Sequence, residues 1–194
     1  MNKLRVLCAA ALAAAIALPA GQGALAESEA PKMTAAEKQA ERDARLKLAV
    51  EGLDKLYAVQ PDARAVVEKA PGYAVFDISS IYALLLVGQK GAGVLFNNAT
   101  KKPTFMLSSR VGTGPGVGKQ RVFQIFVFKT KGAMDQFVLA GGLGGDVSGS
   151  VSTGTDGMVR SFNPQIDIYQ ISVSGMALQA SWGGTVYKVD SDLK

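Results

Sequence analysis

The stretch Val122-Phe-Gln-Ile-Phe-Val-Phe128 is apolar at six of its seven positions and therefore does not alternate between apolar and polar residues. A strand with one buried face shows such alternation, whereas a strand buried on both faces reads as a continuous apolar run. We therefore expect a strand from Arg121 to Phe128 that lies deep in the fold, with other elements packed on both of its faces.

Further runs rich in Val, Ile, Phe and Tyr lie on both sides of this stretch and are separated by Gly, Asn and Asp, as short strands are. The expected strands are 73–78, 81–87, 93–96, 104–111, 121–128, 147–152, 159–162, 166–174 and 177–187. Many of the 22 glycines fall inside or beside these runs, where glycine permits bulges and close backbone approach. The pattern predicts a strongly coiled, glycine-rich and mostly antiparallel sheet, arranged as a sandwich or partial barrel.

Helices are expected before and after the first part of this sheet. Thr34 and Glu37 have the spacing of a capping box, and no proline interrupts the chain from there to Val59. A second, short helix is expected at 63–69, and a third at 131–139, where apolar residues share one face. Together with the strands, these helices predict an α+β fold whose N-terminal helices pack on the sheet.

The face by which the first helix docks is predicted from its apolar periodicity. Apolar residues recur at helical spacing at Leu46, Val50, Leu53 and Tyr57. Glu41 and Arg45 have the i,i+4 spacing of an exposed ion pair, with the acid on the N-terminal side. The second half of the helix is therefore expected to contact the sheet, and Arg45 is expected on the solvated side.

The first 26 residues have the three-part layout of a secretory signal. Lys3 and Arg5 precede a short apolar run, and Ala24 and Ala26 supply the small residues of a cleavage site. We predict a signal peptide at 1–26, a flexible segment at 27–33 and a single domain at 34–190. The protein is accordingly expected to be exported to the periplasm, where it is either free or peripheral on a membrane.

Residue counts exclude most of the common catalytic devices. The chain has no His, and its single Cys, Cys8, lies in the predicted signal peptide. Nucleophilic devices that pair Ser or Cys with His are thereby excluded, as are most zinc sites. We expect no catalytic activity, metal or cofactor, and we rank an unrecognised hydrolase as the last of three alternatives.

The run Gly112-Thr-Gly-Pro-Gly-Val-Gly118-Lys119 invites comparison with phosphate-binding loops. In a Walker A alignment, Thr113 occupies the position of the first glycine, and Gln120 replaces the hydroxyl residue that binds magnesium. The comparison fails at both positions, and we expect a tight or mobile loop between two strands instead.

Positive charge is concentrated in one part of the sequence. Between Ile78 and Met134 there is no Asp or Glu, and the formal net charge of the whole chain is +5. The eight basic residues of this block are Lys90, Lys101, Lys102, Arg110, Lys119, Arg121, Lys129 and Lys131. Basic residues near an anionic bilayer contribute about 1 kcal/mol each. The block therefore predicts attraction to an anionic lipid or another anionic component of the cell envelope.

Other readings of the basic block remain open. Nucleic acid is attracted by the same charges, but aromatic stacking partners are not interleaved with them, and export argues against that partner. The block is also compatible with an ordinary solvated surface on a structural or protein-binding module. Among the eight residues, Arg110, Lys119 and Arg121 flank the glycine run and are the preferred binding candidates.

Three segments of the chain resemble a known family. They are Ala70-Pro-Gly-Tyr-Ala-Val-Phe76, Ile81-Tyr-Ala-Leu-Leu-Leu-Val-Gly88-Gln-Lys-Gly91-Ala-Gly93-Val-Leu95 and Ser172-Val-Ser-Gly175-Met-Ala-Leu-Gln-Ala-Ser181-Trp-Gly-Gly184. These glycine patterns resemble the SYLF domain, a lipid-binding family that is also catalogued as an actin-binding domain in yeast proteins. The similarity extends over about residues 46 to 190.

The resemblance implies non-enzymatic binding of anionic lipids, which are phosphoinositides in the eukaryotic members. It also implies that the amphipathic, lipid-contacting helix of that family corresponds to residues 46–57. The balanced charges of this helix make it a weak membrane binder by itself. From the sequence we therefore expect an exported, β-rich protein that associates with a membrane chiefly through its basic block.

Overall fold

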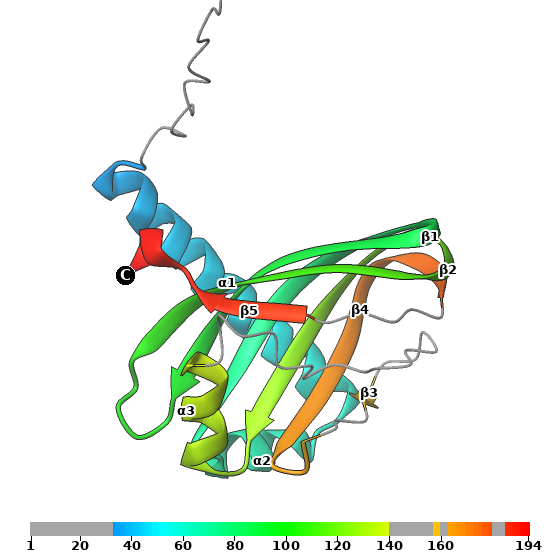
Figure 1. The fold of residues 1–194 in the computed structure, drawn as a ribbon. Helices are drawn as coiled ribbons and strands as arrows, with labels where there is room; N and C mark the ends of the chain where they lie inside the picture. Colours follow the sequence, from blue (N-terminus) through cyan, green and yellow to red (C-terminus); the bar gives the residue numbers. More distant parts are fainter. Residues whose placement is uncertain (1–32, 140–156, 160–162, 180–184) are drawn as a thin grey trace, which may run out of the picture. The chain divides into compact units, whose positions relative to one another are not determined.

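The structure is a computed structural model that describes residues 33–139, 157–159, 163–179 and 185–194, and Met33–Lys194 form one compact unit (Figure 1). Its helices are α1 (Ala35–Val59), α2 (Ala63–Lys69), α3 (Lys131–Leu139) and the short 3-10 helix η1 (Ser191–Leu193). Its strands are β1 (Gly72–Asn97), β2 (Pro103–Phe128), β3 (Gly157–Val159), β4 (Ile166–Gln179) and β5 (Thr185–Val189). The strand expected at 147–152 lies outside the described residues.

The expected α+β fold is confirmed. The strands form one antiparallel sheet in the order β1-β2-β4-β3, with β5 paired to the first half of β2, and the sheet is not closed. All three expected helices are present, and α1 begins with the predicted capping box, in which the Thr34 hydroxyl accepts a hydrogen bond from the Glu37 amide. No helix in the described part of the chain has the length and apolarity needed to span a bilayer.

Several strands that were predicted as separate elements are parts of longer, continuous strands in the structure. The runs at 73–78, 81–87 and 93–96 are parts of β1, and those at 104–111 and 121–128 are parts of β2. The expectation of a loop at 112–118 is wrong, because these residues belong to β2 and pair with β1 and β4. The two strands form one long antiparallel ribbon that is closed by a short turn after Asn97.

This ribbon is folded back on itself near its middle. A Cβ added to Gly93 would lie 2.5 Å from the Val75 carbonyl oxygen, and one added to Gly91 would lie 2.8 Å from the Asp77 carbonyl oxygen. The backbone of the second half of β1 therefore rests directly on the first half. Leu84 lies midway between these contacts, and Figure 1 shows the bend where β1 and β2 turn together.

Both faces of β2 are buried from Val122 to Phe128, as predicted, and the paired start of β1 is buried on both faces at residues 74–76. Phe123 and Ile125 point into a core formed with α1 and α2. Phe126 and Phe128 point into a second core, which contains α3, the returning half of the ribbon and Tyr187 of β5. Gln124 is the one polar residue between Val122 and Phe128, and its Oε1 accepts a 3.1 Å hydrogen bond from the Tyr187 hydroxyl.

The docking face of α1 agrees with the predicted one only in part, because Leu46, Leu53 and Tyr57 pack against the cores but do not form the centre of the contact. Its buried residues are Arg45, Ala49, Gly52 and Leu56, whereas the predicted contact residue Val50 is 58% exposed. A Cβ at Gly52 would lie 2.8 Å from Val75 Cγ1, so the missing side chain brings the helix close to the sheet. The centre of the contact was missed because Ala49 and Gly52 are small residues, which apolar periodicity does not single out.

Arg45 binds the C-terminal segment and is not solvated as expected. Its guanidinium contacts the carboxylates of Asp190 and Glu41, each at 2.8 Å, and both Arg45 and Asp190 are buried. After Asp190 the chain continues into η1, where Leu193 is 2% exposed and packs on Val94 and Phe105. Leu193 is therefore part of the packed core, whereas its neighbours Asp192 and Lys194 are exposed.

Substitution of Gly93 by Ala tests the close approach of the two ribbon halves. Because a Cβ would overlap backbone that has no room to move, we expect a loss of about 3 kcal/mol in the free energy of unfolding. The matched control is Gly88→Ala in the same strand, since nothing lies within 4 Å of a Cβ there. Urea denaturation should show a change within about 0.5 kcal/mol for this control. Equal effects of the two substitutions would contradict the folded ribbon.

Substitution of Asp190 by Ala tests the contact between α1 and the C-terminal segment. The change leaves the Arg45 guanidinium buried without its main partner, which costs about 3 kcal/mol. Thermal and urea unfolding should show this loss, whereas the exposed neighbour variant Asp192→Ala should remain close to the wild type. A wild-type stability for Asp190→Ala would show that the pair does not anchor the segment.

Candidate functional site

The folded ribbon divides the eight predicted basic residues into two groups of four. One group lies at the end of the ribbon opposite the bend, where β1 starts and β2 ends, and we call this the open end. The turn after Asn97 is also there, because the Asn98 amide donates a hydrogen bond to the carbonyl oxygen of Pro71, just before β1. The members of this group are Lys101, Lys102, Lys129 and Lys131. Within this group, Lys129 pairs with Asp167 at 2.7 Å and Lys131 pairs with Asp135. About 40 Å of strand separates the open end from the bend. The basic block of the sequence is therefore not one patch in space.

The other four basic residues lie in the half of the ribbon that contains the bend. Arg110 is 7% exposed, and Arg121 makes two 2.8 Å hydrogen bonds to the Asp77 carboxylate. The hydrogen bonds that the Arg121 guanidinium donates to the Asp77 carboxylate raise the pKa of Arg121. Lys90 and Lys119 are exposed, and neither forms an ion pair with a described residue. Of the three preferred candidates, only Lys119 is thus an exposed, unengaged cation.

The bend itself is covered with exposed aliphatic side chains. We call this surface the apex and define it as Ile81, Leu84, Leu85, Leu86, Val111 and Val117, which are between 55% and 84% exposed. A strand with one buried face exposes alternate residues, but Ala83 to Leu86 are all exposed in succession. Leu84 has a positive φ of 56°, and the pairing of β1 with β2 shifts register between Leu84 and Leu86. The chain turns this corner by presenting both of its faces to solvent.

A cavity of about 500 Å³ lies between the two halves of the ribbon, between the apex and the open end. Lys90 and Lys188 line it together with Ser79, Ser108 and Ser109. Lys188 lies on β5 and pairs in register with Leu107 of β2. A lysine that is distant from the basic block in sequence therefore lines the same cavity as Lys90. Its one carboxylate, Asp77, is already bound by Arg121, and the cavity therefore offers cations and hydroxyl groups to an anionic ligand.

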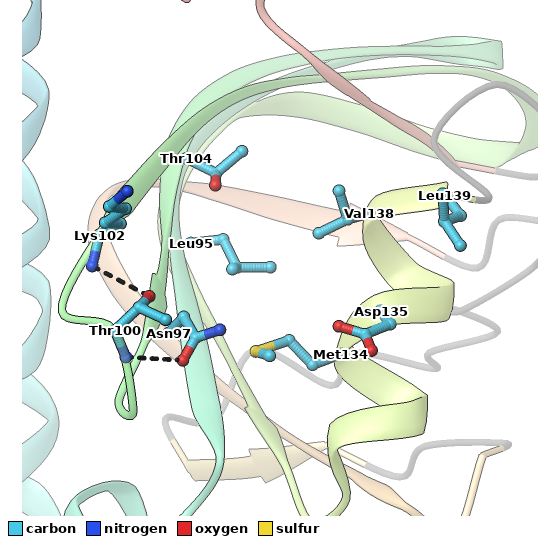
Figure 2. A pocket seen from close by; sticks show the side chains of 9 residues that line it. All are labelled: Leu95, Asn97, Thr100, Lys102, Thr104, Met134, Asp135, Val138 and Leu139. Carbon is cyan, nitrogen blue, oxygen red and sulfur yellow. Dashed lines mark hydrogen bonds between the residues drawn. The ribbon is translucent and has the colours of Figure 1, made fainter.

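A second cavity, of about 370 Å³, lies between the open end of the ribbon and α3 (Figure 2). Figure 2 shows Met134 and Val138 of α3 facing Leu95 and Thr104 of the ribbon. Asp135 is the only carboxylate among the lining residues, and it is bound by Lys131. This cavity therefore presents no pair of carboxylates for acid–base chemistry. Within the described ranges, no group of three His, Cys, Asp or Glu residues is placed to hold a metal ion.

Comparison with known proteins identifies one relevant similarity. No family model matches the chain. The protein is similar to Beta cell expansion factor A of Aeromonas veronii, with 36% identity over 145 residues that cover 73% of this chain. The same alignment covers 54% of the relative, so the chain spans about half the length of the curated protein it matches. The name of the relative refers to beta cell expansion and states no ligand.

Substitution of Leu84 tests whether the backbone at the bend is strained. A left-handed backbone conformation costs a residue with a Cβ about 1 kcal/mol, and Leu84 is 74% exposed, so its side chain contributes little burial. We expect Leu84→Gly to leave the free energy of unfolding unchanged or to raise it by up to about 1 kcal/mol. Leu84→Ala keeps the Cβ and is expected to show no gain. A clear loss of stability in the glycine variant, measured by urea denaturation, would contradict this assignment.

Proposed function

We propose that the protein binds anionic membrane surfaces without catalysing a reaction, and that the half of the ribbon carrying the apex is the surface that contacts lipid. The proposal rests on the exposed aliphatic residues of the apex and on three exposed lysines that lie on the side of the apex toward the open end. These lysines are Lys90, Lys119 and Lys188. The ribbon sequence from Ile78 to Met134 adds no carboxylate that would repel an anionic surface. Aliphatic residues bordered by lysines are typical of proteins that sit in a membrane interface.

The charges are sufficient for reversible binding. Each cation near an anionic surface contributes about 1 kcal/mol, and three lysines therefore supply about 3 kcal/mol, or about a 100-fold preference for anionic over neutral lipid. This attraction falls with increasing salt, because exposed charges are screened beyond a distance of about 10 Å at moderate ionic strength.

The proposal includes membership of the SYLF family and export through the predicted signal peptide. It differs from the family expectation in the element that meets the lipid. The α1 face formed by Ala49, Gly52 and Leu56 is buried against the sheet, and it is therefore occupied in this fold. The apex, in contrast, is exposed and apolar.

Two triple variants that change net charge equally test the proposal. Lys90, Lys119 and Lys188 are replaced by Gln in one variant, and the exposed open-end residues Lys69, Lys101 and Lys102 are replaced by Gln in the other. Co-sedimentation with phosphatidylcholine vesicles that contain phosphatidylglycerol, at low salt, measures the partition coefficient. We expect about a 100-fold loss for the first variant and a much smaller loss for the second.

Equal losses for the two variants would show that net charge, and not this surface, controls binding. Wild-type protein that fails to sediment with anionic vesicles would contradict the proposed function itself. Chromatography of the recovered lipids should show that they are unchanged, since the proposal includes no reaction.

A further inference from the structure

We propose that the apex penetrates the bilayer and places Leu84, Leu85 and Leu86 among the acyl chains, while the flanking lysines remain at the headgroups. This inference rests on the proposed function and extends it from adsorption on a charged surface to insertion. The occupant of the apex is thus the hydrocarbon region of an anionic membrane.

The composition of the apex favours hydrocarbon over a protein partner. All six of its side chains are aliphatic, and they are all at least 55% exposed. Interfaces between proteins are enriched in aromatic residues and Arg at their centres, and the apex contains neither. Such exposure of three consecutive leucines is unfavourable in water, and insertion into acyl chains removes it.

The backbone of the apex limits how deeply it can enter the lipid. Strands enter hydrocarbon only when their N–H and C=O groups are hydrogen-bonded to other strands. Pairing between β1 and β2 continues to Leu84↔Gly116 on one side of the corner and resumes at Leu86↔Thr113 on the other. Pro115, in the unpaired segment between these positions, has no backbone N–H to satisfy. Among the described strands, however, β1 pairs only with β2 and forms the edge of an open sheet, so its outward-facing backbone groups need water or lipid headgroups. The apex is therefore suited to shallow insertion at the interface and not to the centre of the bilayer.

The positions of the lysines limit the depth of insertion. Lys119 lies three residues beyond Gly116 along β2, about 10 Å from the corner. Lysine places its ammonium group at the headgroup level while its methylene chain contacts apolar surface. The apex would therefore insert to the depth of an interfacial element, which is about 5–10 Å, and would not cross the bilayer.

A single labelled cysteine tests insertion directly. The full chain with Cys8→Ser contains no other cysteine, so Leu85→Cys can be labelled uniquely with the environment-sensitive fluorophore NBD. The matched control carries the label at Ala65→Cys, an exposed position on α2 near the open end. Both proteins are mixed with phosphatidylcholine–phosphatidylglycerol vesicles whose lipids carry a nitroxide quencher either on the acyl chain or on the headgroup.

We expect the label at residue 85 to brighten, shift to the blue and be quenched most strongly by the acyl-chain nitroxide. The label at residue 65 should keep its aqueous spectrum. If the protein sediments with vesicles but the label at residue 85 remains in water, the insertion is wrong and the proposed function stands. If nothing sediments, both fail.

A second measurement separates insertion from electrostatic attraction. We expect the variant in which Leu85 and Leu86 are replaced by Ser to lose at least about 10-fold in partition at high salt, where charge is screened. The variant with Lys90, Lys119 and Lys188 replaced by Gln should instead lose the increase in partition that the wild type shows when the salt concentration is lowered. Blue-shifted NBD emission at residue 85 without vesicles, rising with protein concentration, would indicate that a second copy covers the apex and would overturn the proposal.

Discussion

Contact of the β1 backbone with itself is the constraint on which the rest of the structure depends. Gly91 and Gly93 leave no side chain between the two halves of the strand, so the halves lie in direct contact. The paired strand β2 must follow, and the whole ribbon folds in two. The sheet half that contains Phe123 and Phe126 is thereby enclosed between helices on one face and the returning ribbon on the other.

The same fold separates the basic residues and creates the apex. The turn containing Lys101 and Lys102 returns to the start of β1, whereas Lys90 and Lys119 lie toward the corner. The corner itself has no core behind both faces of the strand, and its leucines are consequently exposed. Exposed aliphatic surface therefore lies beside the unengaged Lys119, with Lys90 farther along the same ribbon, and this arrangement underlies the proposed lipid contact.

Local patterns allowed much of the fold to be predicted, because they depend on nearby residues. The capping box at Thr34 and the continuous apolar run from Val122 to Phe128 each report a local requirement, and both predictions are confirmed. The close approach of α1 at Gly52 and the path of the ribbon depend on contacts between distant segments, which periodicity does not reveal. For the same reason, the role of Lys188 appears only once β5 is seen beside β2. Three leucines without alternation, opposite a glycine-rich strand, were the one sequence signal for the apex.

Amide hydrogen exchange of the full wild-type chain, with and without phosphatidylglycerol-containing vesicles, tests the central claim most directly, because it requires no substitution or label. The account predicts that vesicles slow exchange in the peptides around residues 81–90 and 109–119 and leave the turn at 98–102 unchanged. Slowed exchange confined to α1 or to the open-end turn, with the bend unaffected, would contradict it.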